Sequence, residues 1–445
     1  MNYLLRKSME NIDSLRHFYD VQKKYIDKKS KEGMKKYRLG MLVDYYFMVL
    51  TNGTEDDKKK STFLNLQKMI ENHIEIREQD EKKILYTLKD SSLSELHDVT
   101  NSAKEYSKFA EMPIMHSNNT IIMLITRFEE FIADFLRILY EKFPQKYLDK
   151  QTITYSEIAK IGVDDVKQKI IEREIDSIMR QSYSEWFSIF EEHKMNFENC
   201  ATEYEQLKEL YARRNIMVHN CAIVNESYIK NVPNTPYKLG EKLFADEAYI
   251  NKAFESVKTI IFCIMIEGIR IEKANKDSYV DNLFALAFNE LVAKNYVTTK
   301  TVFFSLQKSH LIDEKTKHLA LVNYWISEIA ISGLKCVKAE IEKFDVSALD
   351  KTFVVAKLVL LEKYQEATSY IDELYLKDEL PFSAIEQWPL FMGYRNSSEY
   401  VKFKDSHSEL RGAIALEKPS DVDINDNNKR TVVKSELEDV QTSGT

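Results

Sequence analysis

The sequence predicts an all-α protein, and two features of its composition carry this prediction. Glycine occurs only 10 times and proline only 7 times in 445 residues, well below their usual shares of about 7% and about 5%. No proline lies between Pro236 and Pro381, and no glycine lies between Gly53 and Gly162. Because the intervening segments are rich in Leu, Ile, Lys and Glu, they are typical of long helices joined by short turns.

Residues 1–110 are predicted to form an N-terminal helical region without a catalytic pattern. An amphipathic run from Phe63 to Ile76 is interpreted as helix. The segment 23–38 holds eight basic residues against Asp27 and Glu32. Such a cluster is typical of a solvated helix face, and a local RNA-binding surface is the alternative. With 63 basic and 71 acidic residues the net charge is -8, so any RNA contact must come from a local patch.

Residues 111–275 are predicted to form a second, helical domain. Apolar residues recur every three or four positions from Asn119 to Phe143, and Pro144 ends this helix. Further helices are predicted over 166–180, 184–194, 201–219 and 246–273, with a loop at Pro233 and Pro236.

Residues 280–416 are predicted to form a helical-repeat domain, because five columns of residues align with a period of 34. Four columns are aromatic or apolar in most copies, and the fifth, Thr299/Gly333/Ala367, holds small residues that would let two helices approach. The period is that of a tetratricopeptide hairpin, and the third copy, which starts its second helix at Tyr364, resembles that family best. Ordinary antiparallel helices are the alternative. The polar segment 417–445 is predicted to be a disordered tail.

The spacing of the cysteines and the absence of long apolar runs indicate in which cellular compartment the protein is expected. Cys200, Cys221, Cys263 and Cys336 form no CxxC pair, which argues against a zinc ribbon, a redox dithiol or a secreted disulfide scaffold. The chain shows no apolar signal core and no apolar run of 18 residues. We therefore expect a cytoplasmic protein without a membrane contact.

The segment from Leu210 to Asn220 carries the candidate site, since it places Arg214, Asn215 and His219 near the end of one predicted helix. An imidazole moves protons near neutral pH, and a guanidinium neutralises charge on a phosphorane. Asn215 and His219 are four positions apart and share a helix face. Arg214 lies about 140° around the helix from His219, so its long side chain must bridge the difference.

No metal or cofactor is expected at this site. The acidic pairs Asp56–Asp57 and Asp164–Asp165 have no histidine at ligand spacing, and the chain has no GxxxxGK[ST] or GxGxxG loop. The alternative for the segment is structural: His219 would bond the last helix carbonyls, and Arg214 would form an ordinary ion pair.

The segment resembles the Arg-polar-x3-His signature of the HEPN superfamily, many of whose members are ribonucleases. The resemblance continues in order through Thr126–Pro144, Ile170–Tyr183 with Trp186, and Asn220–Tyr228, which is similar to the RiboL-PSP-like branch. It implies a helical bundle that forms a homodimer with a composite active site. It also implies metal-independent cleavage of RNA by the ribose 2′-hydroxyl, which DNA lacks.

Carried over, the resemblance makes His219 the general acid or base, has Arg214 stabilise the phosphorane, and has Asn215 orient the histidine or the phosphate. Glu129 and Glu130 could be acid–base partners, but such a pair more often orients an arginine, so we expect Glu129 or Glu130 to orient Arg214. Tyr211 and Asn220 would support the motif. Arg213 precedes Arg214, and either arginine could enter the cleft, although Arg214 fits the spacing better.

The setting that the resemblance suggests is a prokaryotic anti-phage defence or toxin system. The repeat would then recognise a regulatory protein or a phage-derived trigger, which is an association by architecture alone. Two other functions stay open: a non-catalytic HEPN-like platform for dimerisation or RNA binding, and a helical-repeat scaffold for protein partners.

Overall fold

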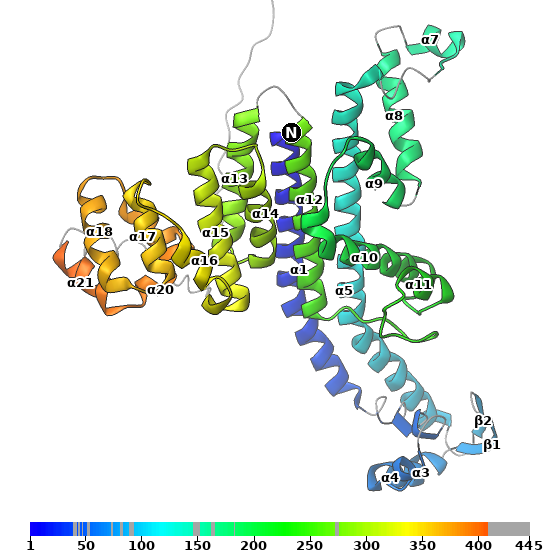
Figure 1. Ribbon diagram of the computed structural model, residues 1–445. Coiled ribbons are helices and arrows are strands. Elements are labelled where there is room, and N and C mark those ends of the chain that lie inside the picture. Colours follow the sequence, from blue (N-terminus) through cyan, green and yellow to red (C-terminus); the bar gives the residue numbers. More distant parts are fainter. Residues whose placement is uncertain are drawn as a thin grey trace, which may run out of the picture.

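The computed structural model describes residues 1–38, 54–72, 74–80, 83–88, 93–145, 152–161, 165–181, 183–271 and 276–407, with a few positions between 42 and 50. The tail predicted over 417–445 lies outside the described residues. The chain is built almost wholly from helices (Figure 1). The predicted all-α class is therefore confirmed, with one small hairpin as an exception.

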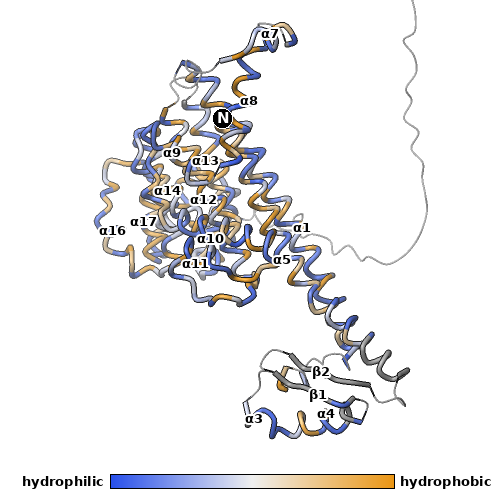
Figure 2. Tube along the Cα trace, turned by 90° about the vertical axis from the view of Figure 1, so that its right-hand side faces the viewer, coloured by the Kyte–Doolittle hydropathy of each residue, from blue (hydrophilic) through white to orange (hydrophobic). Residues whose placement is uncertain are grey.

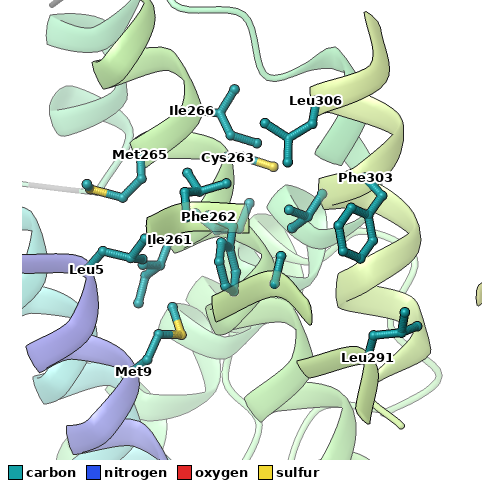
Figure 3. Packing of buried hydrophobic residues seen from close by; sticks show 14 of the residues in the cluster. Leu5, Met9, Ile261, Phe262, Cys263, Met265, Ile266, Leu291, Phe303 and Leu306 are labelled. Atoms are coloured by element: carbon teal, nitrogen blue, oxygen red, sulfur yellow. The ribbon is translucent and has the colours of Figure 1, made fainter. Parts of the chain in front are cut away.

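Three long helices form the centre of the molecule: α1 (Asn2–Lys36), α5 (Leu93–Lys142) and α12 (Glu247–Ile271). In Figure 1, α1 and α5 run side by side and α12 lies along the upper part of α1. Figure 3 shows Leu5 and Met9 of α1 beside Ile261 and Met265 of α12. Hydrophobic and hydrophilic residues alternate along α1 and α5 (Figure 2), as expected for helices with one packed face.

The helix predicted to open at Asn119 begins at Leu93 instead, and it continues through Pro113. Packing against α1 explains the extension. The Tyr19 ring stacks on His116 at 4.9 Å between centroids, and Tyr37 stacks on Phe109 at 5.9 Å. Tertiary contacts of this kind override local sequence signals.

A β-hairpin replaces the end of the helix that was predicted to reach Ile76. The short helix α3 (Glu55–Lys58) and α4 (Ser61–Glu71) precede strands β1 (Ile74–Asp80) and β2 (Lys83–Leu88). The strands pair antiparallel, with Ile74 opposite Leu88 and Asp80 opposite Lys83. The segment Lys83–Leu88, rich in β-branched, aromatic and other apolar residues, is a strand pattern that the helical interpretation overlooked.

Three of the central helices lie close to their predicted bounds: α8 (Val166–Met179), α9 (Tyr183–Glu192) and α10 (Ala201–His219). Three further elements were not predicted: α7 (Tyr155–Ile161), the 3₁₀ turn η2 (Glu198–Cys200) and α11 (Glu226–Asn231). The predicted bounds of α10 are confirmed. Gly268 lets α12 approach α5 closely, because a Cβ there would lie 2.7 Å from the Phe135 ring.

The C-terminal helices form antiparallel pairs on the far side of α12. They are α13 (Lys276–Val292), α14 (Tyr296–Lys308), α15 (Glu314–Ser332), η3 (Leu334–Cys336), α16 (Lys338–Lys343), α17 (Lys351–Leu360), α18 (Tyr364–Leu376), α19 (Phe382–Gln387), η4 (Pro389–Phe391), α20 (Met392–Arg395) and α21 (Ser398–Ser406). Tyr364 starts α18, as predicted for the third copy, and Tyr296 of the same column starts α14. The second copy departs from the period, because its Gly333 ends α15 with φ of 84°.

One continuous hydrophobic core joins these parts, from Leu4 in α1 to Phe403 in α21. A buried ion pair adds to it: Lys258 of α12 lies 2.7 Å from Glu290 of α13 and 2.5 Å from Asp13 of α1. Among the described residues, no helix is both long and apolar enough to cross a lipid bilayer.

Candidate functional site

Helix α10 carries the candidate residues, and a left-handed turn ends it directly after His219. Cys221 and Ala222 have φ of 52° and 62°. The backbone amides of Asn220 and Ala222 both donate to the Ile216 carbonyl at 2.9 Å. The Asn220 side chain donates to the Ile223 carbonyl at 2.7 Å. Asn220 therefore holds the turn that follows the motif.

Arg213 is buried on the inner face of α10, away from the groove described below. Its side chain is 3% exposed and donates to Glu209 at 2.8 Å and to the Phe244 carbonyl at 3.1 Å. Its guanidinium lies 3.9 Å from the centre of the Tyr249 ring. Burial alone would lower the pKa of Arg213, but the neighbouring Tyr249 and Glu209 raise it. Of the two adjacent arginines, Arg213 has a structural role.

Arg214 points to the opposite side, toward α5. Its Nη2 lies 3.6 Å from a carboxylate oxygen of Glu129, and its Nη1 donates to the Asn215 side chain at 3.3 Å. Its Nε is buried without a hydrogen-bond partner. Glu130, the other candidate acid, pairs with Arg127 at 2.8 Å instead. Glu129 is thus the acid that faces the arginine.

A groove of about 1110 Å³ runs between α5, α9, α10 and the segment after α11. The predicted residues that line it are Glu129, Glu130, Tyr211, Arg214 and Asn215. Its further basic and amide side chains are Arg180, Gln181, Lys208, Lys230, Asn231 and Asn234. Pockets of this kind, with polar groups converging on one cavity, are the usual form of a binding site.

An aromatic wall bounds the groove. Tyr211 stacks on Tyr183 at 5.2 Å between centroids and meets Trp186 edge-on at 5.6 Å. The Tyr211 hydroxyl is buried without a hydrogen-bond partner. Burial raises the pKa of Tyr211 well above its usual value, and the nearby Glu129 adds to this shift. The hydroxyl is therefore a neutral donor at physiological pH.

His219 lies outside the lining of the groove. It is exposed at the end of α10, one turn beyond the exposed Asn215 and on the same helix face. The Ile216 carbonyl near the end of α10 accepts two backbone amides, and no hydrogen bond of the His219 imidazole is found among the described residues. The structure thus gathers Glu129, Tyr211, Arg214 and Asn215, and leaves His219 beside them at the surface.

Comparison with known protein families, curated proteins and solved structures found no match to this chain. Within the part of the chain that the structure describes, no cluster of three or more His, Cys, Asp or Glu side chains could hold a metal ion.

Two sets of residues around α10 were not predicted. The first is the network in which Glu209 accepts from Arg213 and from the hydroxyls of Tyr228 and Tyr249. The four-residue spacing of Glu209 and Arg213 is the signal that could have found it. The second is the aromatic wall of Tyr183 and Trp186, which no local spacing links to α10.

Replacing Glu129 by glutamine should change how stability depends on pH. Burial raises the pKa of Glu129 above its usual value, and Arg214 offsets only part of this shift. A carboxyl with a raised pKa stabilises the folded state below its unfolded pKa, and this contribution is lost as pH rises through the folded pKa. The free energy of unfolding, measured at pH 4 and at pH 7, should therefore fall more from pH 4 to pH 7 in the wild type than in Glu129→Gln. An equal change in both proteins would contradict the assignment.

Proposed function

We propose that this protein is an endoribonuclease that cleaves RNA without a metal ion, with the groove beside α10 as its RNA site. The observation that carries this proposal is Arg214. It lines the groove with an Nε that has no partner and with a long ion pair of 3.6 Å to Glu129. A guanidinium with an unused donor is suited to a phosphate oxygen.

The other lining residues suit a single RNA strand. Arg180, Lys208 and Lys230 can contact phosphates, and the half-buried ring of Tyr183 can stack on an unpaired base. Asn215, Asn231 and Asn234 offer amides to base edges or to the ribose. Acidic residues also line the groove, so binding depends on these local contacts rather than on overall charge.

In the proposed reaction, a ribose 2′-oxygen attacks the adjacent phosphorus. The bond from the 2′-oxygen to phosphorus forms, and the bond from phosphorus to the 5′-oxygen breaks. One imidazole takes the 2′ proton, and another gives a proton to the departing 5′-oxygen. Arg214 stabilises the charge on the phosphorane, and Tyr211 is placed to donate a hydrogen bond. The products are a 2′,3′-cyclic phosphate and a 5′-hydroxyl.

Two imidazoles require two copies of the chain, and exposed apolar side chains beside His219 favour such a homodimer. Val218 is 49% exposed, Met115 58% and Ile223 40%. Met115, Met217 and Cys221 also line a small cavity of about 210 Å³ beside the turn that follows His219. Apolar patches of this kind are typical of protein interfaces.

The setting is proposed from the resemblance: an anti-phage or toxin system in which the C-terminal helices recognise a trigger. Helical pairs that stack along one direction offer an extended surface for a protein partner. Because the proposed RNA cleavage depends on Arg214, expression of the wild type should be more toxic to cells than expression of Arg214→Ala.

The test is incubation of the purified protein with total RNA in EDTA, followed by analysis of the fragment ends. We expect fragments with 2′,3′-cyclic phosphate ends from the wild type and from the surface control Arg6→Ala, and none from Arg214→Ala. Fragments with 3′-hydroxyl ends, or cleavage that EDTA abolishes, would contradict the proposal. RNA binding without cleavage, together with equal toxicity of the wild type and Arg214→Ala, would favour a non-catalytic platform.

A further inference from the structure

A second cavity lies at the opposite end of α10 from His219. It has a volume of about 620 Å³ and lies between η2, α12 and α14. Its volume falls in the range of about 300–1,000 Å³ that is typical of small-molecule sites. It shares no lining residue with the groove beside α10, and it lies between the central helices and the C-terminal helices.

The floor of this cavity is apolar. Cys200, Cys263, Ile266 and Leu311 line it and are 0%, 5%, 4% and 8% exposed. Cys263 and Ile266 lie beside Leu306 of α14 in Figure 3. A hydrogen bond with Cys200, together with burial, raises the pKa of the Cys263 thiol. The two thiols are therefore a polarizable apolar surface rather than nucleophiles.

One side of the rim is a set of polar groups held in place. Glu267 accepts from the Asn196 backbone amide at 3.0 Å and from Arg270 Nε at 2.9 Å. Arg270 also donates to the Lys194 carbonyl. Across the cavity, Asn199 donates to Ser305 of α14 at 3.2 Å. These bonds fix the rim before any ligand arrives, which lowers the entropy lost on binding.

The other side of the rim is basic. Glu267 and Arg270 neutralise one another, but no carboxylate of the described residues pairs with Lys308. The Lys308 ammonium is exposed and lies 5.7 Å from the Phe304 ring centre. His310 adds an exposed imidazole next to it. The cavity therefore combines an apolar floor, amide groups and an unpaired cation.

We propose that this cavity binds a nucleotide. The base lies on the floor of Cys263 and Ile266, the amides of Asn196 and Asn199 contact its edge or the ribose, and the phosphate is bound by Lys308. A free phosphate would leave the apolar floor empty, and an uncharged apolar ligand would leave Lys308 without a partner. The proposal does not depend on the ribonuclease activity, because no residue is shared between the two sites.

The experiment is titration of the full-length protein with ATP, GTP, CTP, UTP and AMP, and with adenosine and inorganic phosphate separately, by calorimetry and by shift of the melting temperature. At least one nucleotide should bind, and a ligand that binds only the folded protein should raise its Tm. Adenosine and phosphate should each bind at least about tenfold more weakly than the best nucleotide, since each makes only part of the contacts.

Three variants locate the binding. Lys308→Glu should weaken it at least about tenfold by repelling the phosphate. Lys335→Glu, an exposed charge reversal in η3, and Arg214→Ala in the groove should leave it unchanged. The proposal is overturned if no nucleotide binds, if Lys308→Glu binds as the wild type does, or if Arg214→Ala abolishes the binding.

Discussion

Replacing Arg213 by methionine should destabilise the part of the molecule around α10 by about 3–5 kcal/mol, because this change removes one partner of a buried ion pair. Glu209 would keep its contacts with Tyr228 and Tyr249 and lose the one charged partner that it has among the described residues. The Glu209 side chain is 16% exposed, so water could replace little of the lost interaction. Native-state hydrogen exchange of the α10 amides would measure the change locally.

Arg214→Met is the matched control, since the two arginines are adjacent in the same helix. The side chain of Arg214 is 28% exposed and lies 3.6 Å from Glu129. A partly exposed pair at that distance contributes about 1 kcal/mol or less. The two neighbouring substitutions should therefore affect different properties. Arg213→Met should reduce stability, whereas Arg214→Met should reduce RNA cleavage with little change in stability.

A second variant distinguishes the destabilisation caused by an unpaired carboxylate from the destabilisation caused by lost packing. Adding Glu209→Gln to Arg213→Met removes the unpaired carboxylate, so the double variant should regain part of the lost stability. If the two substitutions destabilise additively, the charge interaction across Glu209 and Arg213 is not what holds α10 in place.

The sequence predicted those helices whose ends are marked by local chemistry. Helix α10 has its predicted bounds, and α8 and α12 lie within two residues of theirs. The apolar positions of these helices are frequent and regularly spaced. The start of α5 was missed because the part of this helix before Asn119 packs on α1, a partner far away in the sequence. The hairpin was missed because a strand pattern followed a helical one without a glycine or proline between them.

At the candidate site, too, the sequence predicted what depends on local spacing and missed what depends on distant segments. The spacing placed Arg214, Asn215 and His219 on one short segment, and the structure places the first two on the groove. It favoured Arg214 but did not exclude Arg213, because adjacent arginines differ in their surroundings and not in their chemistry. Those surroundings come from distant segments, with Tyr249 beside Arg213 and Glu129 beside Arg214.

Replacing His219 by alanine should lower the rate of RNA cleavage by about 10²–10⁴-fold, the usual contribution of a general acid or base. The side chain is exposed, so the melting temperature should stay within about 1 °C of the wild type, because surface substitutions change stability little. The measurement is the single-turnover cleavage of an RNA oligonucleotide in EDTA.

Two controls determine whether the imidazole itself acts in that reaction. His17→Ala removes an exposed histidine of α1 and should leave the rate unchanged. Imidazole added to His219→Ala should restore part of the activity, because a free base can enter the vacated position. Rescue by imidazole would assign proton transfer to His219. A variant that cleaves at the wild-type rate would instead leave Arg214 acting without this histidine. In the proposed homodimer, mixing an excess of His219→Ala with wild type should lower the activity per wild-type chain, since each composite site needs both imidazoles.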